Sequence, residues 1–168
     1  SASTTRFIRS ITAAALRGKG YEVLVAPMLR YEPVAFALAS DARFDAILVT
    51  STNALRALAE TPDGTRLLAT PLYAVGRRTA EAAREFGFTH VMAARGDGAS
   101  LRDLVVAQMR AKPLKKSATL LYLAAADRAV DLDAALRPRG FNVVTVTAYR
   151  MVAIPDLPSE VCDAVAAG

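Results

Sequence analysis

The sequence predicts an α/β protein built on a doubly wound parallel sheet, and three observations support this prediction. Short apolar runs of the kind found in strands buried on both faces recur along the chain. Helical patterns separate these runs, and the connections are short. The chain has 168 residues, of which 53% are hydrophobic, so it can bury a substantial core. We expect the flavodoxin-like strand order.

One stretch, residues 44–55, shows the pattern most clearly. An apolar run passes into four small polar residues and then into a helical pattern, which predicts a strand over 46–50 and a helix over 53–60. Thr50, Ser51 and Asn53 then lie at the carboxyl end of the strand, where open α/β sheets bind ligands. Alternatively, these residues only cap the helix, and the stretch taken alone favours that alternative.

The alternation continues to residue 147. The predicted strands are 72–75, 90–94, 119–124 and 143–147, and the predicted helices are 78–86, 100–111 and 129–137. Residues 61–64, Thr-Pro-Asp-Gly, predict a turn. Because parallel strands end at the same edge of a sheet, the strand ends at 50–51, 76, 94–95 and 124–126 are expected to line one edge.

Both ends of the chain predict parts of a second domain. The predicted elements are a helix over 9–18, a strand over 22–26, extended segments over 28–32 and 148–155, and the beginning of a helix over 157–167. The segment 148–155 can pair with 25–33 as a two-stranded connector. We therefore expect a partial first domain with connector strands in residues 1–33 and 148–168, and a complete second domain in residues 34–147.

Composition narrows the class of partner. The net charge of +5 suits an acidic small molecule or a polyanion, but the basic residues are scattered and lack the interleaved aromatics of nucleic-acid modules. The single cysteine, Cys162, allows no internal disulfide and favours a reducing compartment. No apolar run is long enough to cross a bilayer, and no signal peptide is recognisable. We expect a cytoplasmic protein.

Two further strand-to-helix turns are candidate sites. Gly76 and Thr79 open the helix over 78–86 and could bind an anion, although an ordinary turn is equally compatible. Residues 95–98, Arg-Gly-Asp-Gly, also precede a helix, but Asp97 repels anions, so a helix cap is favoured. His90 is the only histidine and lies at a strand start, so the sequence offers no convincing metal site or nucleophile set.

Tyr149 has a polar tip on an apolar body and falls on the expected connector. The residue could face a ligand at a hinge, or it could pack across the ladder, and the sequence leaves both interpretations open.

The order and spacing of these features resemble the uroporphyrinogen-III synthase family, from about residue 12 onward. The residues that carry the resemblance are 20–27 (GYEVLVAP), 44–53, 74–76 with 79–80, 98 with 101, 122–123 with 132 and 136, 140–143 (GFNV) and 148–150 (AYR).

The resemblance implies two flavodoxin-like domains joined by a two-stranded ladder, with the active site in the cleft between them. It also implies a lyase of tetrapyrrole (heme) biosynthesis that cyclises hydroxymethylbilane to uroporphyrinogen III with inversion of ring D. The family uses no cofactor and no metal. We expect a monomer whose partner is this small molecule rather than nucleic acid or a membrane. The substrate carries an acetate and a propionate on every pyrrole, which suits a basic chain and helix N-termini.

The resemblance also implies roles for particular residues. The family's acid candidate corresponds to Tyr149, its Thr-Ser turn to Thr50 and Ser51, and its Gly…Thr turn to Gly76 and Thr79. Asn53 and Ala125 lie on the same predicted edge and are expected to contact substrate. Catalysis would consist mostly of folding the bilane so that its ends meet, with weak acid assistance to the leaving hydroxyl.

The chain departs from the family at both ends. Residues 5–7, Thr-Arg-Phe, follow no strand where the family has a strand ending in Thr-Arg-Pro, and the family's last stretch is absent after Gly168. We therefore expect an incomplete first domain in this chain. The alternative function is a non-catalytic ligand-binding or regulatory domain, although a receiver module would need acidic residues where Thr50 and Ser51 stand.

Overall fold

The computed structural model describes residues 29–111, 118–127 and 131–153. The chain divides into two compact units, residues 31–152 and residues 1–30 with 153–168. The larger unit carries the fold described below. The helices predicted over 9–18 and 157–167 and the strand predicted over 22–26 lie outside the described residues.

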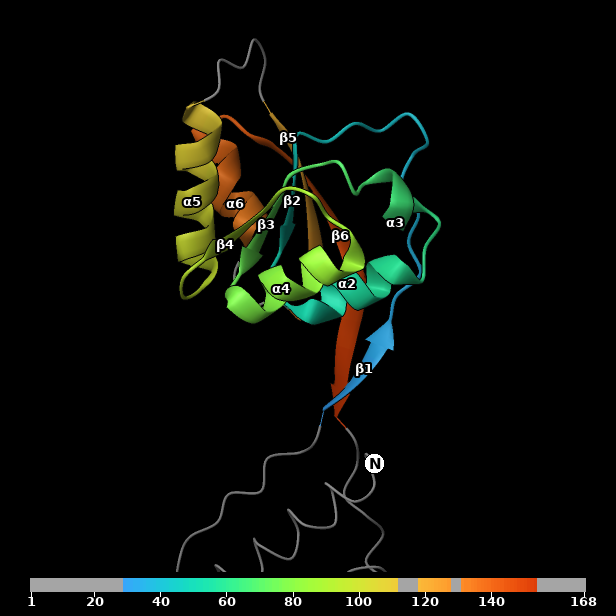
Figure 1. Ribbon diagram of the computed structural model, residues 1–168. Helices are drawn as coiled ribbons and strands as arrows, with labels where there is room; N and C mark the ends of the chain where they lie inside the picture. The colour runs from blue at the N-terminus through green and yellow to red at the C-terminus, as the bar shows by residue number, and fades with distance from the viewer. Residues whose placement is uncertain (1–28, 112–117, 128–130, 154–168) are drawn as a thin grey trace, which may run out of the picture. The chain divides into compact units, whose positions relative to one another are not determined.

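A six-stranded sheet forms the centre of the fold (Figure 1). Across the sheet the order is β1 (Leu29–Pro33), β6 (Asn142–Ala153), β5 (Thr119–Ala125), β2 (Ala46–Val49), β3 (Leu72–Val75) and β4 (Val91–Ala94). The strands from β6 to β4 pair in parallel, as predicted. All four residues of β2 are buried, which is why this central strand is a continuous apolar run rather than an alternating one.

The strand order differs from the prediction. Counted along the chain from β2, the parallel strands lie in the order 3-2-1-4-5, whereas the flavodoxin-like order is 2-1-3-4-5. The chain moves from β2 outward to β3 and β4, then returns to place β5 on the other side of β2. Each strand has the same apolar pattern in either order, so the sequence pattern does not distinguish them.

Two pairs of helices cover the sheet, one pair on each face (Figure 1). Helices α2 (Thr52–Ala59) and α4 (Arg77–Phe86) pack on one face, and α5 (Gly98–Arg110) and α6 (Leu132–Leu136) on the other. Successive residues of β2 point to opposite faces, so Ile47 lies in the first core and Leu48 in the second. Right-handed crossovers that run in opposite directions from β2 produce this three-layer arrangement.

Local signals set most element boundaries close to the predicted ones, with two corrections. The predicted turn at 61–64 continues into a short helix, α3 (Asp63–Arg66). The helix predicted over 129–137 is α6 followed by the 3-10 turn η1 (Arg137–Arg139), and the side chain of Asp131 caps its start by accepting from the Ala134 N–H at 3.2 Å. At α6 a carboxylate cap decides the boundary, whereas α3 begins after Pro62 without a side-chain cap.

Strand β6 continues where two separate segments were predicted, over 143–147 and 148–155. Its far end lies beside β1 and pairs with it (Figure 1). Next to this pairing the Val34 N–H donates to the Ala148 carbonyl at 2.9 Å. The predicted pairing of these segments is therefore confirmed for the described residues. A register shift after Ala124 places Ala125 opposite Tyr149.

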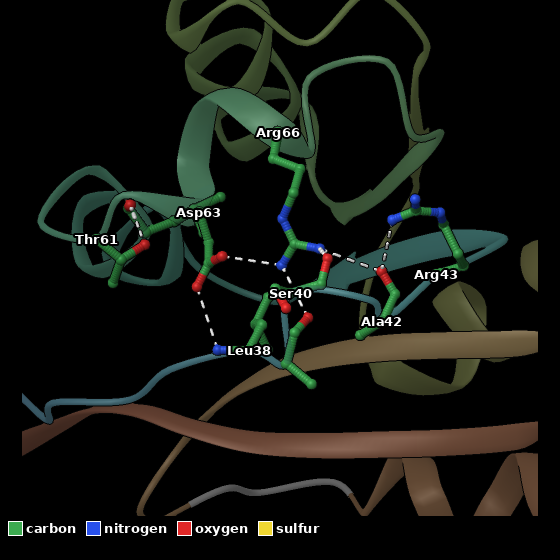
Figure 2. Close-up of polar contacts among 9 residues, drawn as sticks. Leu38, Ser40, Ala42, Arg43, Thr61, Asp63 and Arg66 are labelled. Carbon is green, nitrogen blue, oxygen red and sulfur yellow. Dashed lines mark hydrogen bonds and ion pairs between the residues drawn. The ribbon is translucent and has the colours of Figure 1, made fainter.

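The segment between β1 and β2 is held by Arg66 (Figure 2). The guanidinium donates to three backbone carbonyls of residues 39–42 at 3.2–3.3 Å and to Asp63 at 2.8 Å. The other Asp63 oxygen accepts from the Leu38 N–H at 3.1 Å. The Arg66 hydrogen bond first, and then the Leu38 N–H, lower the pKa of Asp63. Both terminal nitrogens of Arg66 and both oxygens of Asp63 thus have partners within the protein.

Candidate functional site

The carboxyl ends of three neighbouring strands bring the predicted binding residues to one edge of the sheet. Ala125 ends β5, Thr50 follows β2, and Gly76 follows β3. The strand order reverses between β5 and β2, because the chain leaves β2 in one direction and returns to its other side. Open α/β sheets bind ligands outside the carboxyl ends of their strands at such a reversal. The candidate site is therefore centred on the ends of β2 and β5.

The turn after β2 shows how the local sequence builds this edge. Ser51 is the N-cap of α2, and its hydroxyl accepts from the Asn53 N–H at 3.2 Å. The capping interpretation of Ser51 is therefore confirmed. The amide Nδ2 of Asn53 lies 3.5 Å from the sulfur of Met151 in β6, so α2 and β6 meet beside the site. Thr50 is half-buried at the strand end.

Tyr149 lies next to these residues but is largely buried. Its backbone carbonyl accepts from the Ala126 N–H at 2.8 Å, and its side chain is only 4% exposed. The ring belongs to the core beneath α2 and α4 and contacts the ring of Tyr31 with 6.0 Å between centroids. The structure thus shows the packing that the sequence allowed for Tyr149, and an acid role for its hydroxyl stays a prediction.

The structure adds three residues that the sequence reasoning missed. The guanidinium carbon of Arg56 lies 4.2 Å from the centroid of the Tyr31 ring, and the Tyr31 hydroxyl is 3.5 Å from a carboxylate oxygen of Glu60. Burial, followed by the charge of Glu60, raises the pKa of Tyr31 and outweighs the opposing charge of Arg56, so this phenol is neutral at neutral pH. The spacing 53, 56, 60 on one face of a helix was the available signal.

Gly76 and Thr79 lie one strand further along the edge. Gly76 has a φ of 78°, and a Cβ there would meet no atom within 4 Å. Glycine is thus required by the backbone conformation and not by lack of space. Thr79, in the first turn of α4, is 7% exposed, and no hydrogen bond within the described part of the chain engages its hydroxyl.

The turn after β4 carries a carboxylate, Asp97, unlike the turns after β2 and β3. The Asp97 carboxylate is the N-cap of α5 and accepts from the Ser100 N–H at 3.1 Å. That hydrogen bond is the main reason why the pKa of Asp97 is lowered, so the group is ionised at neutral pH. The prediction of a cap at this turn is confirmed.

The opposite edge of the sheet carries His90. This histidine precedes β4 and lines a pocket of about 320 Å³ with Tyr73, Met92 and Gln108 among its neighbours. The pocket is at the amino ends of β3 and β4 and so lies away from the candidate site. In residues 29–111, 118–127 and 131–153, no group of three or more His, Cys, Asp or Glu side chains could hold a metal ion. Within the same ranges, no helix combines the length and apolarity needed to span a bilayer.

Comparison with known proteins decides the family. The model of the uroporphyrinogen-III synthase HemD family matches residues 10–168, nearly the whole chain. The protein belongs to this family. A search of curated proteins found no match.

The solved structure of uroporphyrinogen-III synthetase from Helicobacter pylori 26695 is similar to this member of the synthase family. The two share 24% sequence identity with a TM-score of 0.57, over 79% of this chain and 57% of that one. At this identity the likeness shows the mixed α/β fold alone. The chain thus matches little more than half the length of the Helicobacter protein.

Proposed function

We propose that the protein is a uroporphyrinogen-III synthase, a lyase that cyclises hydroxymethylbilane with inversion of ring D in tetrapyrrole biosynthesis. The observation that carries this proposal is the family match over residues 10–168. The α/β fold shared with the Helicobacter pylori protein supports it. We also propose the bilobal architecture expected for the family, with the 3-2-1-4-5 strand order in the lobe described here.

The proposed site lies at the carboxyl edge around β2 and β5. On one side are Thr50, Ser51, Asn53 and Ala125, and on the other are Gly76 and Thr79. The start of α4 has no side-chain cap and favours anions, and the net charge of +5 attracts a substrate with many carboxylates. These groups position the flexible bilane so that its two ends meet.

Tyr149 is the proposed acid. Its phenol would transfer a proton to the hydroxyl of the bilane, which leaves as water, and the resulting phenolate would take up the proton that is released when the attacked pyrrole regains its aromaticity after ring closure. The site needs only weak assistance, because the electron-rich pyrrole stabilises the cation that remains. The side chain is held by its burial, so little ordering of the acid is needed when substrate binds. In this proposal the protein acts as a cytoplasmic monomer and uses no cofactor or metal.

The test uses the full-length protein and freshly generated hydroxymethylbilane. The uroporphyrin isomers are separated after oxidation, and a reaction without protein gives the spontaneous background. We expect the type III isomer above that background. Formation of the type I isomer alone would overturn the proposal and favour a non-catalytic ligand-binding domain.

A further inference from the structure

The face of α2 beside the candidate site carries Arg56, a cation that forms no ion pair with a carboxylate of the described residues. Arg56 is exposed. Glu60, one turn later on the same helix face, accepts from the Tyr31 hydroxyl at 3.5 Å. Arg56 therefore differs from Arg66, whose donors are satisfied inside the protein.

Arg56 is nevertheless held in place by an aromatic ring. Its guanidinium stacks on Tyr31 at 4.2 Å, and Tyr31 in turn packs against Tyr149. The contact with the ring uses no hydrogen-bond donor of the guanidinium, and among the described residues no side chain or backbone carbonyl accepts from Arg56, so its N–H groups can donate to a ligand. Those N–H groups match the two oxygens of a carboxylate. The stack thus presents an oriented carboxylate receptor.

The position of this receptor relates it to the site. Arg56 lies three residues after Asn53, about 4.5 Å further along the axis of α2. Tyr31 links it to Tyr149, the proposed acid, through direct ring contact. Asn53 and Arg56 therefore lie on one face of α2, and Tyr149, Tyr31 and Arg56 form a row of side chains in contact.

We propose that Arg56 binds an acetate or propionate carboxylate of the bilane, with Tyr31 as the positioning residue that orients it. This inference rests on the proposed function, because it assigns a substrate carboxylate to the same site. It predicts that Arg56 contributes mainly to binding, and that the ring of Tyr31 matters more than its hydroxyl.

The first experiment measures kcat and KM for hydroxymethylbilane with three variants of the full-length protein. Arg56→Met removes the charge and the donors but keeps the length of the stem, and Arg56→Lys keeps the charge but loses the planar rim. Arg110→Met is the matched control, because Arg110 is an exposed arginine in the last turn of α5 and its substitution also removes one positive charge. We expect KM to rise about tenfold for Arg56→Met, as for a charged hydrogen bond, and less for Arg56→Lys. The kcat of all three variants, and the KM of Arg110→Met, should stay near the wild-type values.

Two variants of Tyr31 separate its ring from its hydroxyl. Tyr31→Phe keeps a ring for Arg56 to stack on, so its KM should stay within about twofold of wild type. Tyr31→Leu removes the ring and should raise KM severalfold. In the double variant with Arg56→Met the two effects should not add, because both act through one interaction.

The outcomes distinguish this inference from the proposed function. If wild type makes type III isomer and Arg56→Met has the KM of Arg110→Met, the inference is wrong and the function stands. If wild type makes no type III isomer, the function is wrong, and the affinity of each variant for uroporphyrin III, an octacarboxylate measured by its fluorescence, decides the inference. Weaker binding by Arg56→Met than by Arg110→Met supports carboxylate recognition, and equal binding overturns it.

Discussion

Two arginines in consecutive helices have opposite environments. Arg66 in α3 donates to three backbone carbonyls and to Asp63 and so fixes the segment that leads into β2 (Figure 2). Arg56 in α2 rests one face on Tyr31 and, within the described residues, has no carboxylate partner. The comparison teaches that the partners of a guanidinium indicate its role. An arginine whose donors are satisfied internally stabilises the fold, whereas one oriented only by stacking can bind a ligand.

The largest expected effect is at Tyr149, which contacts Tyr31 and so belongs to the same row of side chains as Arg56. Tyr149→Phe should lower kcat about a hundredfold, because it removes the proposed acid while keeping the ring. The melting temperature should change little, since the ring supplies the packing. The matched control is Tyr73→Phe, which removes a buried phenol from the opposite core. Equal kcat values for the two variants would remove Tyr149 from the acid role.

The next effect is on stability, at Arg66. Arg66→Met should lower the free energy of unfolding by about 2 kcal/mol, because the Asp63 carboxylate and three carbonyls lose a charged donor. KM should not change, in contrast to Arg56→Met. Urea unfolding and steady-state kinetics of the same preparations give both values. A raised KM with unaltered stability would show that Arg66 binds substrate, and the contrast with Arg56 would then be wrong.

A smaller effect comes from the pH dependence of the Arg66 cluster. Because the pKa of Asp63 is lowered in the folded state, its contribution to stability is present above the unfolded pKa of about 4 and is lost as pH falls through the folded value. Wild type should be about 1 kcal/mol more stable than Asp63→Asn at pH 7, and the difference should shrink below pH 4. Urea unfolding at pH 7, 4 and 3 measures it. A difference that stays constant with pH would show that the charge is not responsible.

The smallest expected effect is at Thr79, at the far end of the candidate site. Thr79→Ala should raise KM about threefold, as for one neutral hydrogen bond, and Thr79→Ser should restore the wild-type value because it keeps the hydroxyl. The same measurement on Arg56→Met sets the scale for a charged contact. An unchanged KM for Thr79→Ala would confine the binding residues to the β2 and β5 side.

The candidate site was predictable to the extent that it follows from local signals. The small polar residues after the apolar run at 46–49 marked both a strand end and a helix cap, and Ser51 forms that cap. The Asp97 turn was assigned correctly because a carboxylate before a helix start is a cap whatever surrounds it. The contact of Arg56 with Tyr31 was missed because it joins positions 25 residues apart, and the helical spacing 53, 56, 60 gives no indication of Tyr31.

The sequence by itself determined most strands and helices of the larger unit, although not α3, and the edge of the sheet at which its polar turns gather. These features depend on apolar periodicity and capping, which act between neighbours in the chain. Only the tertiary structure decided the 3-2-1-4-5 order, the single long β6 and the row of Tyr149, Tyr31 and Arg56. Each of these depends on which distant segments pack together, and several packings satisfy the same local pattern.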